Sequence, residues 1–300
     1  MGRPLIRRLA ALAIAACLAV ACRGTSGSPG WVAGREEVLV DLGARTMTAG
    51  TTLLDAGRGS MIAVWAEKSG IRALEIDRSW GHAADPEELS DVRASALAGL
   101  ALPSGCGPGG ERFVVVVTPE RKDTEGNAEM LAIFLREGGK AGTTVAIPLV
   151  AGPYTTDVSL AGGCDGIAVG WGRGSVGDFA AVVAMLDPAT GGVSWQRRMS
   201  ADGANGFSPA IAVAGGRILA VWGEARLAFG SGDEDPSRGR LVTAVLDADG
   251  GWVRRPRPLA TTTRPEVTPS IAQPAAEGGA GAAILFKDRP KDEFRTGIYL

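Results

Sequence analysis

The chain has 300 residues, and its 44 glycines and 17 prolines are spread between short apolar runs. This composition favours many turns joining short strands over long helices. The formal net charge of −2 at pH 7 argues against a nucleic-acid binder, and a single histidine excludes a histidine-based zinc cluster.

The first residues have the three-part layout of a secretory signal. Arg3, Arg7 and Arg8 precede an apolar run that begins at Leu9, and small residues follow it. The run is too short for a typical membrane-spanning helix, so we expect a signal peptide that is cleaved.

This segment resembles the bacterial lipoprotein signal, in which small residues precede a cysteine that is cleaved at and acylated. Cys17 and Cys22 both fit, but Cys22 follows the longer apolar core and precedes the flexible polar tether RGTSGSPG. We favour lipidation of Cys22, and an ordinary cleaved signal without lipid is the alternative. The predicted division is a signal peptide over 1–21, a tether over 22–35 and a folded domain over 36–300.

The lipoprotein resemblance also implies a location. It places the folded domain outside the cytoplasm at the bacterial cell envelope, attached to a membrane through the lipid. Arg23, which follows the modified cysteine, favours the outer membrane if the cell has one.

Five apolar runs recur at intervals of about 50 residues, with a longer last interval. Each follows a short strand-like segment and a glycine-rich turn, and each is followed by a polar loop and further strand-like segments. The runs cover 61–65, 113–117, 167–171, 218–222 and 282–286. Four strands per repeat indicate the blade of a β-propeller, and continuously apolar second strands indicate burial on both faces.

The repeats predict an all-β, five-bladed propeller of four-stranded antiparallel blades. A fifth blade begins at Val267 but contains only three strand-like segments, and the strand over 36–43 would supply its outer strand. Such pairing closes the ring and removes free sheet edges. A fragment of a propeller with six or more blades is the alternative. The four complete blades are expected over 51–92, 93–150, 151–200 and 206–260.

The segment LDPATGGVSW, residues 186–195, resembles the Asp-box turn of sialidase-like (BNR-type) propellers, which lies between the third and fourth strands of a blade. The leading serine of that motif is absent, and residues 246–252 form a looser copy. The resemblance implies a fold more than an activity, because propellers include both enzymes and binding modules.

Cys106 and Cys164 remain outside the signal segment, and an exported chain occupies a compartment where disulfides persist. A bridge between them would close a loop of about 58 residues and stabilise the fold by about 4 kcal/mol on the chain-entropy model. Two separate thiols are the alternative.

Charged residues end the second strand at matching places in four blades: Glu67, Arg173, Glu224 and Asp288. We expect them at the face that carries the loops between second and third strands, as candidate ligand-binding residues. Solvated charges that end apolar strands are the alternative.

These features favour a non-enzymatic binding or interaction module for a protein or a carbohydrate, with no cofactor and no bound metal. The alternative is a carbohydrate-active hydrolase, which needs two carboxyl groups at the same face. A sialidase mechanism is disfavoured because the only tyrosines are Tyr154 and Tyr299, and Tyr299 falls in the predicted last strand.

Overall fold

The computed structural model describes residues 47–57, 59–76, 85–102, 105–120, 129–148, 154–175, 178–202, 204–226, 239–262, 269–272, 283–288 and 295–299. Within these ranges the chain is all β apart from one short 3-10 helix, η1 (Glu137–Gly139). The predicted signal peptide, tether, lipidated Cys22 and closing strand over 36–43 lie outside the described residues and stay predictions.

The strands form antiparallel sheets in which consecutive strands are neighbours. The first sheet contains β1 (Met47–Gly57), β2 (Ser60–Glu67), β3 (Gly70–Ile76) and β4 (Glu87–Ser90). The second contains β5 (Ala94–Ala101), β6 (Phe113–Pro119), β7 (Glu129–Leu135) and β8 (Ala141–Pro148). The third contains β9 (Tyr154–Gly163), β10 (Gly166–Ser175), β11 (Asp178–Leu186) and β12 (Val193–Arg198).

The fourth sheet contains β13 (Ala204–Ala214), β14 (Arg217–Arg226), β15 (Gly239–Asp247) and β16 (Trp252–Thr262). A three-stranded sheet follows, with β17 (Pro269–Ala272), β18 (Ala283–Asp288) and β19 (Arg295–Tyr299). The sheets coincide with the predicted repeats, so the prediction of four-stranded antiparallel units is confirmed.

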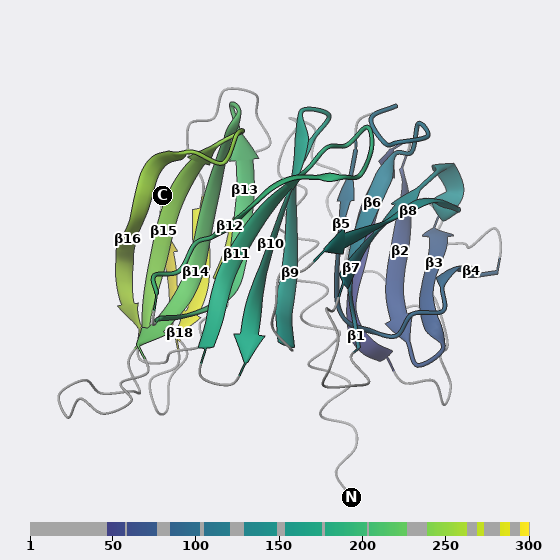
Figure 1. Ribbon diagram of the computed structural model, residues 1–300. Helices are drawn as coiled ribbons and strands as arrows, with labels where there is room; N and C mark the ends of the chain where they lie inside the picture. Colours follow the sequence, from purple (N-terminus) through teal and green to yellow (C-terminus); the bar gives the residue numbers. More distant parts are fainter. Residues whose placement is uncertain are drawn as a thin grey trace, which may run out of the picture.

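The sheets are the blades of a β-propeller and stand side by side in sequence order (Figure 1). The first strands of consecutive blades contact one another, from β1 through β5, β9 and β13 to β17. The second strands β2 and β10 point the same way in Figure 1, so both end at one face of the molecule. We call this face, where the second strands end, the second-strand face.

The hydrophobic core lies between the blades. Side chains alternate across a strand, so the central strand β6 contributes to two interfaces. Its residues Phe113, Val115 and Val117 pack with the first blade, and Val114 and Val116 pack with the third. All five are at most 2% exposed. The predicted burial of second strands on both faces is therefore confirmed for β6.

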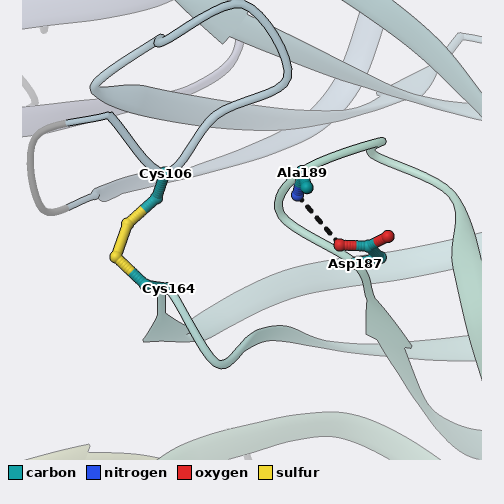
Figure 2. Close-up of a disulfide and its surroundings, with 4 residues drawn as sticks. All are labelled: Cys106, Cys164, Asp187 and Ala189. Carbon is teal, nitrogen blue, oxygen red and sulfur yellow. Dashed lines mark hydrogen bonds between the residues drawn. A yellow bond between two sulfur atoms is a disulfide. The ribbon is translucent and has the colours of Figure 1, made fainter.

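Cys106 and Cys164 form the predicted disulfide, which crosses between two blades (Figure 2). Cys106 lies in the loop between β5 and β6, and Cys164 lies in the turn between β9 and β10. Their Cα atoms are 5.1 Å apart and their sequence separation is 58. The bond therefore joins the first turns of the second and third blades.

The two Asp-box-like segments form turns between the third and fourth strands of their blades, as the resemblance implied. Asp187 accepts hydrogen bonds from Ala189 N and Thr190 Oγ1, both at 2.9 Å; Figure 2 shows the Ala189 bond. In the next blade, Asp247 Oδ1 accepts from Asp249 N at 3.1 Å and Gly251 N at 2.6 Å. Each carboxylate holds its turn by local hydrogen bonds to the backbone.

The two turns also tie the third blade to the fourth. Trp195, which follows the first turn, donates its indole N–H to Ala248 O of the second turn at 2.8 Å. The Arg197 guanidinium lies 4.9 Å from the centre of the Trp252 ring, within cation–π range. These two contacts link the outer parts of the third and fourth blades.

Candidate functional site

The four charged candidates lie in second strands of four different blades. Glu67 is the last residue of β2, Arg173 and Glu224 lie near the ends of β10 and β14, and Asp288 is the last residue of β18. The structure therefore places all four toward the second-strand face. The Asp288 side chain lies outside what the structure describes.

Glu67 and Glu224 are buried, with relative exposures of 1% and 2%. Each follows a tryptophan by two residues, and residues two apart project from the same face of a strand. Trp65 Nε1 donates to Glu67 Oε1 at 2.9 Å, and Trp222 Nε1 donates to Glu224 Oε2 at 3.3 Å. The alternative of solvated strand-end charges is therefore wrong for these two residues.

Both carboxylates have further donors. Arg240, which faces Glu224 across β14 and β15, donates from Nε at 2.9 Å and from Nη2 to Glu224 Oε1. Ser69 Oγ donates to Glu67 Oε2 at 3.1 Å. A buried carboxylate is stable only when such hydrogen bonds replace its hydration. The Trp-x-Glu pair is thus a repeated structural unit that holds a buried carboxylate.

The third blade has the same tryptophan but the opposite charge. Trp171 is fully buried, and Arg173 stands where the first and fourth blades have glutamate. Trp171 Nε1 and Arg173 Nε are both buried and have no hydrogen-bond partner in the described part of the chain. Burial also lowers the pKa of the Arg173 guanidinium. This is the one candidate for which the structure supplies donors and no acceptor among described residues.

Sequence reasoning identified the strand-end charges but missed the role of the tryptophans. The sequence does contain a sign of this contact: the repeated segments 64–67 (VWAE) and 221–224 (VWGE) put an indole and a carboxylate two residues apart. Period-two alternation alone puts such a pair on one face of a strand. The sequence 170–173 (GWGR) marks the blade where that pair is broken.

Glu111 is a second buried charge that the sequence did not point to. It is 0% exposed and lies in the loop that carries Cys106. Oε1 accepts from Thr143 N at 3.1 Å and Thr143 Oγ1 at 3.0 Å, and Oε2 accepts from Gly109 N. Burial raises the pKa of this carboxyl, but the hydrogen bonds from Gly109 and Thr143 outweigh burial and hold the pKa below its usual value.

No cluster of three or more histidine, cysteine, aspartate or glutamate residues suited to a metal ion occurs among the described residues. Within the same ranges, no helix has the length and apolarity needed to cross a membrane.

No protein-family model matches the chain, and no curated protein matches it in sequence. Among solved structures, the chain is similar to the GH93 α-L-arabinofuranosidase of Fusarium graminearum in complex with arabinobiose, with a TM-score of 0.55 and 10% identity. The match covers 83% of this chain and 76% of that one. A mutant of an α-L-arabinofuranosidase from Fusarium graminearum, in complex with an iminosugar inhibitor, gives a TM-score of 0.52 and 11% identity, over 80% of this chain and 74% of the other.

Hydrazine synthase of Kuenenia stuttgartiensis is also similar, with a TM-score of 0.51 and 12% identity. The match covers 80% of this chain, which spans 64% of the length of that one. At these identities the similarities concern the fold alone. The class that the structure defines is therefore a β-propeller, a fold that glycoside hydrolases and binding proteins share.

Proposed function

We propose that the chain is an exported, lipid-anchored β-propeller that binds a protein or a carbohydrate at the bacterial cell envelope without catalysing a reaction. The second-strand face is the proposed binding face. The observation that carries this proposal is the state of Glu67 and Glu224: both are buried and hydrogen-bonded within their own blades. Hydrogen bonds take up oxygens of both carboxylates, whereas a hydrolase needs two carboxyl groups that flank a substrate bond.

Attachment through Cys22 is part of the proposal. The Cys106–Cys164 disulfide supports a location outside the cytoplasm, because such bonds persist in oxidising compartments. Cell fractionation tests the anchor: Cys22→Ala should release the chain from membranes, and Cys17→Ala should leave it attached. Release by Cys17→Ala alone would move the lipid to that residue.

The alternative function is a carbohydrate-active hydrolase that uses Asp or Glu at the second-strand face. The specific observation in its favour is the likeness in fold to α-L-arabinofuranosidases, one of them in complex with arabinobiose. The arrangement of Glu67 and Glu224 gives this alternative no support.

One assay separates the two functions. The full chain is incubated with a panel of immobilised glycans that includes arabinan, and both retained protein and released sugar are measured. The proposal predicts retention on particular glycans, or capture of a defined envelope protein by cross-linking, with no released sugar. Release of sugar that a heat-denatured sample does not give would decide for the hydrolase.

We also propose that five blades close into a ring. In the third and fourth blades, the face with Trp171 or Trp222 packs on the preceding blade. The corresponding face of the first blade is also buried, through Ala63, Trp65, Leu74 and Ile76. The fifth blade would cover this face, and the strand over 36–43 would pair with β19.

A further inference from the structure

Three buried hydrogen-bond donors without partners lie between the second and third blades. They are the Trp171 indole N–H, the Arg173 Nε–H and the Thr118 hydroxyl, and none has a hydrogen-bond partner within the described ranges. Buried polar groups are almost always hydrogen-bonded, so three such donors at one interface require an explanation.

Strand geometry places the three groups at the same interface between blades. Trp171 and Val116 of β6 belong to the same hydrophobic core between these blades. Thr118 follows Val116 by two residues and Arg173 follows Trp171 by two, so both project into the same interface. β6 and β10 are second strands of neighbouring blades, and both residues lie at the ends that reach the second-strand face. We call this group of Thr118, Trp171 and Arg173 the interblade donor site.

The fourth blade shows what these donors can hold. There, a carboxylate accepts the indole N–H of Trp222 and two guanidinium N–H groups of Arg240. In the third blade the tryptophan is kept, Arg173 takes the position of Glu224, and Ala180 takes the position of Arg240. The third blade therefore keeps the tryptophan donor and has a cationic donor at the position of the carboxylate acceptor.

We propose that the interblade donor site binds the carboxylate group of a ligand. Arg173 would supply the cation and a planar fork of donors, and Trp171 and Thr118 would supply neutral donors. The inference rests on the proposed binding function, because it gives the chemistry of the ligand for the second-strand face.

Two further features fit a carboxylate ligand. Arg173 is only half-buried, so part of the residue is open to the surface. Burial lowers the pKa of its guanidinium, and a bound anion would favour the charged form again. A carboxylate on a sugar acid and one on an acidic side chain present the same two oxygens.

Nuclear magnetic resonance of the full chain with 15N-labelled tryptophan tests the proposal. Sodium acetate and sodium glucuronate are titrated at constant ionic strength, with chloride and inorganic phosphate as comparison ions. The Trp171 indole resonance is assigned by its loss in Trp171→Phe. It should shift saturably with both carboxylates, while the Trp222 resonance, whose N–H already has an acceptor, should not move.

Substitutions locate the binding. Arg173→Ala should weaken acetate and glucuronate binding at least tenfold, and Thr118→Val should weaken it a few-fold. Arg255→Ala is the matched control, because it removes one exposed cation from β16 of the fourth blade and should leave the affinity unchanged. If Arg173→Ala does not fold, Arg173→Lys keeps the charge, loses the fork and should still weaken binding.

Absence of a saturable Trp171 shift with either carboxylate in the unsubstituted chain would overturn the proposal. Equal weakening by Arg173→Ala and Arg255→Ala, or a saturable shift with phosphate alone, would overturn it as well. The small probes keep this result separate from the proposed function. Carboxylate binding together with sugar release would refute only the non-enzymatic role, and glycan retention without a Trp171 shift would refute only the donor site.

Discussion

Glu111 has a pH-dependent effect on stability whose sign follows from its hydrogen bonds. Its pKa in the folded chain lies below the usual value of 4.5. A carboxyl whose folded pKa is lowered stabilises the fold fully above its unfolded pKa and loses that contribution as the pH falls through the folded value. The contribution of Glu111 should therefore be complete at neutral pH and decline below about pH 4.5.

We predict that Glu111→Gln lowers the free energy of unfolding at pH 7 by about 1–3 kcal/mol, because charge-assisted bonds to Gly109 and Thr143 become neutral ones. The difference from the unsubstituted chain should begin to shrink below about pH 4.5 and disappear as the pH falls through the lowered pKa of Glu111 in the folded chain. Urea unfolding at pH 7 and pH 3 measures both values. Glu129→Gln, at an exposed position that begins β7, should change neither. An equal difference at both pH values would contradict the assigned role of the charge.

The identity of single residues could be read from the sequence, but their surroundings could not. Residue identity was enough to select Glu67, Arg173, Glu224 and Asp288, because each is a charged residue that follows the apolar run of a second strand. It could not show that both glutamates are buried, since burial depends on which other parts of the chain pack against them. Glu111 was out of reach for a similar reason: its donor Thr143 lies 32 residues away in the chain.

The disulfide links the loop between β5 and β6 to the turn between β9 and β10. The two blades are separate sheets, and no strand of one pairs with a strand of the other. The disulfide therefore adds a covalent link between blades that otherwise pack through side chains. We predict that Cys106→Ala combined with Cys164→Ala lowers the free energy of unfolding by about 4 kcal/mol on the chain-entropy model.

Urea unfolding with and without a thiol reductant measures this effect. Reductant should lower the midpoint of the unsubstituted chain toward that of the double variant and should leave the double variant unchanged. If neither the reductant nor the double substitution changes the urea midpoint, the bond does not constrain the unfolded chain.

Strands and turns were easier to predict from the sequence than the contacts between blades. Second strands such as β6 could be located from sequence because a strand buried on both faces is continuously apolar. The Asp187 turn was also recognisable, because an aspartate followed by glycines forms a local turn with its own backbone. The bond from Trp195 to Ala248 was not, because it joins residues 53 apart in different blades.

The sequence repeat predicted a β-propeller. Closure of its ring is a separate prediction, because it needs the strand over 36–43 to pair with the last blade. The buried face of the first blade, with Trp65 at 4% exposure, supports a neighbouring blade on that side. Within the described residues, β19 is the outermost strand of the fifth blade. An edge of this kind invites pairing with another chain unless a further strand covers it.

We predict that deletion of residues 36–43 exposes the edge of β19 and loosens the fifth blade from the first. The full chain without this segment should unfold at a lower urea concentration and should form soluble aggregates that size-exclusion chromatography with light scattering detects. Deletion of residues 24–31 removes the same length from the predicted tether and should have neither effect. If the two deletions behave alike, the strand over 36–43 does not close the ring, and the edge of β19 must be covered by another part of the molecule or by a partner.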